Sequence, residues 1–272
     1  MKSEEANTDN NSIVYSCYHK ESRQGEHFVP RHTLSYQVKG TLVLNDGSRD
    51  YTSQEGALRF IRRNQLLRFT KIPPPAGEFE SVSLYFDQQV LKDFSLEYGI
   101  TAEAAQQAKP IVPIKMTDSF KSFLESLITY LNAGQFSNKQ MAALKLKEGL
   151  LLLLETHPEI KNILFEFVEP HKIDLEAFMN KNYHFNVRLE RFAYLTGRSL
   201  ATFKRDFEKI FHESPHKWLL HKRLHEAHYL LKVKGRTASD IYLDLGFEDL
   251  SHFSFAFKKQ FGESPSALAK TI

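Results

Sequence analysis

The chain has only one cysteine in 272 residues, Cys17, which excludes an internal disulfide and a metal site built from several cysteines. We expect Cys17 to be a buried or inert residue rather than a reactive thiol. Long hydrophobic runs are also missing, because the longest, Leu150 to Leu154, is far below the roughly 20 apolar residues that cross a bilayer. The polar stretch 1–11 has no apolar export signal and is expected to be disordered. These absences predict a cytoplasmic protein with no membrane partner.

Motifs for catalysis are absent as well. The sequence contains neither a glycine-rich phosphate-binding loop nor a nucleophile elbow. A metal site normally needs clustered histidines and carboxylates, but the front part has only His19, His27, His32 and His157, without a His-x-His pair. We therefore predict no catalytic residue, no metal site and no cofactor.

Charge is distributed unevenly along the chain. Residues 170–272 carry 17 Lys and Arg against 12 Asp and Glu, whereas residues 1–169 carry 19 against 21. The tail is thus about +5 and the front about −2. A modest basic excess is compatible with nucleic acid but also with an ordinary solvated surface. With 42% hydrophobic and 25% charged residues, the chain is expected to form two globular domains.

The front part reads as short strands followed by helices. Alternating apolar residues bounded by turn signals predict strands over Ile13–Tyr18, Thr33–Lys39, Thr41–Leu44, Tyr51–Thr52, Ala57–Ile61, Leu66–Lys71 and Phe79–Phe86. Many short strands at close spacing favour a small β-barrel or sandwich over residues 12–109. Residues 110–169 are predicted to form a helical linker or dimerisation segment, and Glu169-Pro170 is a plausible boundary because proline disfavours helix in the preceding residue.

Two amphipathic helices are expected within residues 118–156. The apolar positions at helical spacing are Phe120, Phe123, Leu124, Leu127, Ile128 and Leu131, then Met141, Leu144, Leu151 and Leu154. Two interpretations stay open: these helices pack on the β domain, or they join two subunits in a homodimer. In the second case the stripe of Phe123, Leu127 and Leu131 would be the contact.

The tail contains an internal repeat at an offset of fifty residues. The matching positions are Phe203 and Phe253, Phe207 and Phe257, Lys209 and Lys259, Phe211 and Phe261, and the runs Glu213-Ser214-Pro215 and Glu263-Ser264-Pro265. Phenylalanines at i, i+4 and i+8 lie on one face of a helix, and the Ser-Pro pair opens the next segment. One supersecondary unit therefore occurs twice.

Each copy has the elements of a helix-turn-helix. In the first, about residues 186–211, a short amphipathic helix precedes Gly197 as the left-handed turn residue and Ser199 as the cap of the next helix. In the second, about residues 238–261, a helix over Ala238–Leu245 precedes Gly246 and Asp249 in the same roles. Two copies are much stronger support than a single helix-glycine-helix pattern.

The runs RLHEAHYLL (223–231) and GFEDLSHFSFAFKKQFGESP (246–265) resemble the AraC/XylS family of bacterial transcription regulators. The resemblance covers about Leu175 to Lys270, and the front part resembles the family's cupin-like sensor domains only in strand content and position. It implies a multidomain chain: a cupin-like β-barrel plus helices, then an all-α, homeodomain-like double helix-turn-helix domain over residues 170–272. Both recognition helices would enter successive major grooves of promoter DNA, about 34 Å apart.

The expected DNA-binding residues lie on the outer faces of the two recognition helices. They are Ser199, Ala201, Thr202, Lys204 and Arg205 in the first unit and Leu250, Ser251, His252, Phe255, Lys258 and Lys259 in the second. Arg205 and Lys204 are the best candidates for a guanine contact, with a phosphate contact as the alternative. The family pattern favours glutamine where Leu250 stands, arginine where Phe255 stands and alanine where Tyr242 stands. Sequence readout should therefore depend more on the first helix-turn-helix, while the polar residues of the second helix-turn-helix contact the DNA backbone.

Control is assigned to the front domain. It is expected to bind a small-molecule effector or, alternatively, a regulatory protein, and RNA polymerase and a second copy of the chain are further expected partners. The rival from another class is a metal-dependent cupin enzyme fused to a DNA-binding tail, which the missing ligand cluster disfavours.

Overall fold

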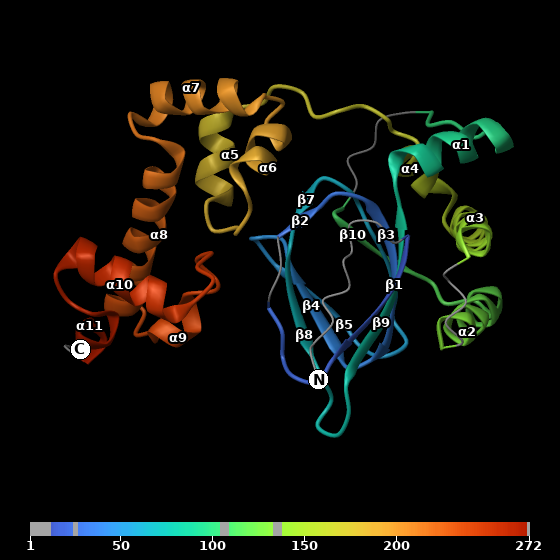
Figure 1. Ribbon diagram of the computed structural model, residues 1–272, viewed down its shortest axis with the longest axis horizontal. Helices are drawn as coiled ribbons and strands as arrows, with labels where there is room; N and C mark the ends of the chain where they lie inside the picture. The colour runs from blue at the N-terminus through green and yellow to red at the C-terminus, as the bar shows by residue number, and fades with distance from the viewer. Residues whose placement is uncertain (1–11, 24–26, 104–108, 133–137, 271–272) are drawn as a thin grey trace. The chain divides into compact units, whose positions relative to one another are not determined.

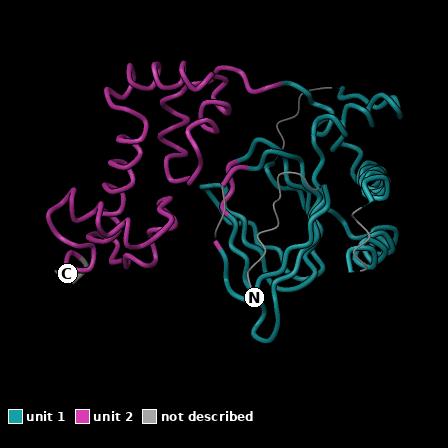
Figure 2. The backbone as a smooth tube through the Cα atoms, viewed as in Figure 1, with its two compact units in different colours: residues 1–22, 29–65, 69–168 teal, residues 23–28, 66–68, 169–272 magenta. Residues whose placement is uncertain are grey.

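A computed structural model of the protein describes residues 12–23, 27–103, 109–132 and 138–270. The chain divides into two compact units, shown in separate colours in Figure 2. Unit 1 consists of Met1–Ser22, Val29–Gln65 and Phe69–Val168, and unit 2 of Arg23–Phe28, Leu66–Arg68 and Glu169–Ile272. The expected disordered segment 1–11 lies outside the described residues. Subdivision of the front part at residues 109 and 110 stays a prediction.

Unit 1 is built around β-sheets, as the strand pattern predicted. The strands of the chain are β1 (Ile13–Tyr18), β2 (Phe28–Val29), β3 (His32–Lys39), β4 (Thr41–Asn45), β5 (Asp50–Ser53), β6 (Leu58–Ile61), β7 (Gln65–Leu66), β8 (Arg68–Ile72), β9 (Phe79–Phe86) and β10 (Ile111–Ile114). All of their residues belong to unit 1 except Phe28, Leu66 and Arg68, which belong to unit 2. They form a five-stranded sheet in the order β1-β9-β3-β6-β10, a three-stranded sheet β5-β4-β8 and the pair β2-β7. The β-rich domain is confirmed, and closure of these sheets into a cupin-like barrel stays a prediction.

Helices cover one face of the five-stranded sheet. They are α1 (Gln88–Tyr98), α2 (Asp118–Asn132) and α3 (Lys139–Thr156), followed by η2 (Pro158–Ile160) and α4 (Lys161–Leu164). Figure 1 shows α2 and α3 beside β1 and β9, with β4, β5 and β8 on the other side of the sheet. Alternation in the strands places Leu34, Phe60 and Leu84 in one core cluster with helix residues. Burial of this apolar face holds the layer together.

The stripe proposed as a dimer contact belongs to this core. Phe123 and Leu127 are 2% and 0% exposed, and Leu131 is partly buried against the same cluster. On α3 the core side is formed by Leu146, Leu150 and Leu153 instead of the predicted Leu144 and Leu151. The five consecutive leucines centred on Leu152 put a leucine on every face of the helix. Their spacing alone therefore does not identify which face is buried.

His32 begins β3 as a fully buried histidine, 1% exposed. Its ring stacks on Phe60 with 5.4 Å between ring centroids, and its Nδ1 accepts a hydrogen bond from the backbone N–H of Arg63 at 3.2 Å. Burial, with smaller contributions from Arg63 and Arg62, lowers the pKa of His32 to about 3. The imidazole therefore stays neutral in the folded chain at pH values where an exposed histidine, with a pKa of about 6.5, gains a proton.

Acid is expected to destabilise unit 1 through His32. Between pH 6.5 and about 3 the unfolded chain binds a proton that the folded chain does not, so the free energy of unfolding falls as the pH falls. At pH 4.5 this loss is about 2–3 kcal/mol. Melting temperatures of the full chain and of His32→Asn should be compared between pH 4.5 and 7.5. The asparagine Oδ1 can accept the Arg63 N–H without titrating, so the variant should lose less stability in acid, and parallel curves would contradict the assignment.

Unit 2 is helical over its long stretch from Glu169. Its helices are α5 (Leu175–Asn182), α6 (Leu189–Leu195), α7 (Leu200–Phe211), α8 (Pro215–Lys232), α9 (Ala238–Ile241), α10 (Leu250–Phe261) and α11 (Pro265–Lys270). Two core clusters form, one around Phe203 and Phe207 and the other around Phe253 and Phe257. The repeated phenylalanine faces thus each organise a separate core, and the predicted all-α tail is confirmed.

Candidate nucleic-acid interface

The first helix-turn-helix consists of α6, a tight turn and α7. Gly197 has φ +64°, and a Cβ placed on it would collide with the backbone of His171, so the position requires glycine. Ser199 then begins α7 as its cap, because its Oγ accepts a hydrogen bond from the backbone N–H of Thr202 at 3.2 Å. The sequence prediction for this turn and cap is confirmed.

The outer face of α7 carries the DNA-binding residues predicted for the first helix-turn-helix. Ser199, Ala201, Lys204 and Arg205 are exposed, whereas Thr202 is half-buried and its Oγ1 accepts from Ser199 Oγ at 3.0 Å. The opposite face holds the buried Phe203 and Phe207. A helix with a buried aromatic face and an outer face of small and cationic side chains can approach a polyanion without disturbing its core.

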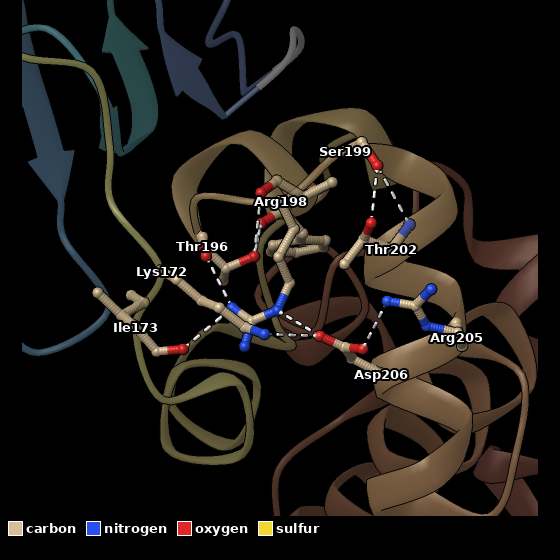
Figure 3. Close-up of polar contacts among 10 residues, drawn as sticks. Lys172, Ile173, Thr196, Arg198, Ser199, Thr202, Arg205 and Asp206 are labelled. Atoms are coloured by element: carbon tan, nitrogen blue, oxygen red, sulfur yellow. Dashed lines mark hydrogen bonds and ion pairs between the residues drawn. The ribbon is translucent and has the colours of Figure 1, made fainter.

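Asp206 connects three basic side chains beside this face (Figure 3). Its carboxylate lies 3.2 Å from Arg198 Nε, 3.4 Å from Lys172 Nζ and 3.5 Å from Arg205 Nη2. The hydrogen bond from Arg198, together with the charges of Lys172 and Arg205, holds the pKa of Asp206 below its usual value. Arg198 also donates to the carbonyls of Ile173 and Thr196, at 3.0 and 2.7 Å, which fixes the turn to the chain before α5.

Arg205 differs from Arg198 in being accessible to a ligand. Its side chain is 65% exposed, against 6% for Arg198. An exposed ion pair of this kind contributes little to stability, so the guanidinium can exchange Asp206 for another partner at small cost. The role of Asp206 was not foreseen from the sequence, because nothing local marks the charges that meet it.

The second helix-turn-helix repeats this plan with a shorter first helix. α9 ends at Ile241 instead of the predicted Leu245, and the chain continues in hydrogen-bonded turns, with Leu245 N–H donating to Ile241 O at 3.0 Å. Gly246 has φ +81°. Asp249 caps α10, since its Oδ1 accepts from the backbone N–H of His252 at 2.6 Å. The predicted turn glycine and cap are therefore confirmed.

The outer face of α10 is partly apolar. Leu250 and Phe255 are 37% and 70% exposed, while Phe253 and Phe257 on the inner face are fully buried. The remaining predicted residues, Ser251, His252, Lys258 and Lys259, are exposed. Phe255 leaves most of its surface exposed, so its ring is available for contact with another molecule.

Arg223 of the connecting helix α8 ties the two helix-turn-helix folds together. It donates to the carbonyls of Tyr183 and Phe185, which precede the first fold, at 2.8 and 2.9 Å, and to the carbonyl of Gly246 in the second turn at 2.9 Å. A Cβ on Gly246 would lie 2.9 Å from Arg223 Cζ, so glycine is also needed for this approach. Burial lowers the pKa of Arg223 to about 10, which leaves it charged at neutral pH. Its position within the run 223–231 was noted from the sequence, but its role was not.

The described part of unit 1 also contains one cluster of side chains that could bind a metal ion. The ligand atoms of Cys17, His19 and Glu78 lie within 4.8 Å of one another. Cys17 was expected to be buried or inert, and burial is wrong because Cys17 is exposed. Partial desolvation and the Glu78 carboxylate raise the pKa of its thiol to about 11, which disfavours the thiolate that metals bind. His27 and His32 are not brought together with this group.

Two helix-turn-helix folds within one compact unit, each with an exposed recognition-helix face, define a DNA-binding protein. A family model described as a helix-turn-helix domain matches residues 192–271, and one described as the ExsA N-terminal regulatory domain matches residues 32–163. The chain belongs to the AraC/XylS family of transcriptional regulators. It is a DNA-binding regulator with an N-terminal regulatory domain.

Two curated relatives are similar to this chain along most of its length. The chain is 25% identical over 234 residues to the HTH-type transcriptional regulator ExsA of Pseudomonas aeruginosa, covering 84% of this chain and 82% of the relative. It is 26% identical over 242 residues to the virulence regulon transcriptional activator VirF of Yersinia enterocolitica, covering 84% and 85%. A crystal structure of ToxT from Vibrio cholerae, 14% identical, covers 96% of this chain and 98% of that chain with a TM-score of 0.46. No helix among the described residues is long and apolar enough to span a membrane.

Proposed function

We propose that this regulator binds promoter DNA in the bacterial cytoplasm by placing α7 and α10 in successive major grooves. The observation that carries the proposal is the attachment of both folds to one connecting helix through Arg223, which fixes their separation. Successive major grooves on one side of B-DNA are about 34 Å apart. A rigid pair can engage both without the entropic cost of ordering a linker.

Within this proposal the first helix-turn-helix reads bases. Arg205 and Lys204 lie in the first half of α7, the part of a recognition helix whose side chains reach the base edges. Arg205 would pair with O6 and N7 of a guanine, exchanging Asp206 for the base. Ser199, Ala201 and Thr202 would line the same approach, with Ser199 and Thr202 engaged mainly in the cap.

The second helix-turn-helix would recognise DNA differently. Leu250 and Phe255 cannot hydrogen-bond a base, but both can contact the methyl group of thymine. Ser251, His252, Lys258 and Lys259 would contact phosphates, which position the helix without reading sequence. The preferred operator should therefore have a guanine in the half-site of α7 and thymines in the half-site of α10.

Arg205→Ala tests whether the first helix-turn-helix reads bases. We expect it to cost about 1–3 kcal/mol of binding free energy at the preferred operator and to relax the base preference at one position. Arg205→Lys is the matched control, because it keeps the charge for a phosphate but loses the two-pronged guanine contact. Gel-shift titrations on the operator and on scrambled DNA, at one fixed salt concentration, measure both effects. Equal losses on both DNAs for the alanine variant, with full rescue by lysine, would show that Arg205 contacts only phosphate.

The front unit is proposed to control this binding rather than to catalyse a reaction. Its matched region is a regulatory domain in a family of transcription regulators, and VirF is named a transcriptional activator. We propose that this chain also activates transcription, by contact with RNA polymerase. Control would come from a small-molecule effector or from a regulatory protein.

A homodimer is proposed through the outer face of α3. Leu144 and Leu151 are 61% and 42% exposed and lie seven residues apart, which puts them on one helix face. The core contacts of α3 lie on other positions, Leu146, Leu150 and Leu153. A second copy would cover this exposed leucine pair and join two DNA-binding units.

A further inference from the structure

The five-stranded sheet of unit 1 has a second face that is polar although it is buried. The side chains concerned, called here the polar face, are Thr33, Ser35 and Gln37 of β3, Arg59 of β6, and Ser81 and Ser83 of β9, each 9% exposed or less. Strand register pairs Ser35 with both Arg59 and Ser83, so these three lie side by side on one surface. Figure 1 shows this sheet with helices on one side and β4, β5 and β8 on the other. Facing sheets usually bury apolar side chains between them, so a row of hydroxyls there requires an explanation.

Arg59 is the centre of the polar face and is 2% exposed. Its Nη2 donates to Ser35 Oγ at 3.2 Å and to Gln37 Oε1 at 3.1 Å, and Ser83 Oγ donates in turn to Ser35 Oγ at 3.0 Å. Its Nε and Nη1 are buried and have no hydrogen-bond partner. No carboxylate among the described residues forms an ion pair with it.

This arrangement leaves a buried positive charge uncompensated. Burial lowers the pKa of Arg59 to about 10, which still leaves the guanidinium charged at neutral pH. Nε and Nη1 together carry three N–H groups, more than half of the five donors of an arginine. Buried charges in proteins are normally paired, and an unpaired donor is costly unless a ligand satisfies it. Carboxylate oxygens are the acceptors that match a guanidinium best in charge and geometry.

We propose that the polar face is the binding site of a small organic carboxylate, whose oxygens pair with Nε and Nη1 of Arg59. Gln37 and the hydroxyls of Ser35 and Ser83 surround this charge. β4, which Figure 1 shows on the side of the sheet away from the helices, carries two buried apolar residues, Leu42 and Leu44. Apolar residues on this side of the sheet suit a hydrocarbon part of the ligand. The proposal rests on the proposed regulatory role of unit 1 and assigns its effector to the class of monocarboxylic acids.

Thermal melting and calorimetric titration of the full chain test the proposal. The probes are hexanoate and benzoate, with hexanol and benzyl alcohol as uncharged counterparts and inorganic phosphate as a different anion. We expect at least one of the two carboxylates to bind and to raise the melting temperature, and the alcohols and phosphate to do neither. Arg59→Met keeps an unbranched apolar stem and removes the guanidinium together with its charge. It should weaken carboxylate binding at least ~30-fold, because it removes one partner of a buried charge pair.

The ligand-free variant separates a binding role from a structural one. If Arg59 is kept for a ligand, Arg59→Met should melt no lower than the native chain, because it removes an uncompensated buried charge. A variant that does not fold would show that Arg59 is structural and would overturn the proposal. Ser83→Ala removes a neighbouring hydroxyl with little risk to folding, and it should weaken carboxylate binding several-fold.

Four further results would overturn the proposal: no binding by either carboxylate, equal binding by phosphate, equal binding by the alcohols, or unchanged binding in Arg59→Met. Gel shifts in carboxylate-free buffer distinguish this failure from failure of the proposed DNA binding. Arg59→Met should bind operator DNA with the affinity of the native chain, whereas Arg205→Ala should bind it more weakly.

Discussion

Replacement of Leu127 by aspartate is expected to unfold unit 1. Leu127 lies on α2, is fully buried and belongs to the cluster that also contains Leu84 and Phe123. The change removes core contacts and places a carboxylate among the buried apolar side chains of this cluster, which costs on the order of 5 kcal/mol. That is comparable with the whole stability of many domains. Circular dichroism and thermal melting of the full chain should show loss of the β-rich unit.

Leu144→Asp on the neighbouring helix is the matched control. Leu144 is 61% exposed, so this variant should keep its fold and change the melting temperature little. If α3 joins two copies, sedimentation should show Leu144→Asp as a folded monomer beside a native dimer. A folded monomer from Leu127→Asp would instead mean that the α2 stripe is the intersubunit contact and that its burial in the monomer core is wrong.

Replacement of Arg223 by alanine is expected to have the largest effect in unit 2. It removes the donor from three carbonyls, those of Tyr183, Phe185 and Gly246, and opens a gap beside the second turn. Leaving buried acceptors unsatisfied in this way costs about 3–5 kcal/mol. Both helix-turn-helix folds then lose the hydrogen bonds that join them through Arg223 of α8. Affinity for the full operator should fall on the order of tenfold or more, because the two units no longer bind as one.

Two variants distinguish this coupling from a general loss of positive charge. Lys232→Ala removes an exposed cation from the same helix and should change the melting temperature little. Arg223→Lys keeps the charge but cannot reach three acceptors with one ammonium group, so it should recover only part of the stability. Melting curves and gel shifts on operators with one or two half-sites measure both effects. Equal weakening on single and paired half-sites would contradict a coupling role for Arg223.

Local patterns predicted much of unit 1 correctly. Strands β1 and β9 have the predicted bounds, because each is a short run rich in β-branched and aromatic residues. The predicted strand over Leu66–Lys71 is instead divided between β7 and β8. β10 was missed, because residues 110–169 were predicted to be a helical linker. Pro113 is tolerated in this strand since β10 is at the edge of its sheet, where a missing N–H leaves no ladder bond unmade.

Helix α1 was also missed, although the chain carries signals for it. Asp87 accepts from the N–H of Val90 as the cap, and Gly99 ends the helix in the left-handed conformation. Only Leu91 and Phe94 are buried, so the apolar period is too short to stand out from a loop. In the tail, the phenylalanine faces and both caps were predicted correctly, since repetition made a weak local pattern specific.

The sequence by itself determined the two helix-turn-helix folds of the tail and the alternating strands of the front. These depend on interactions between residues a few positions apart, such as the bond from Thr202 N–H to Ser199 or the left-handed turn at Gly197. Only the tertiary structure decided that Leu127 faces the core, that Arg223 joins both folds and that Arg59 is buried without a counter-charge. Their partners lie tens of residues away along the chain, and no local spacing specifies which distant group each will meet.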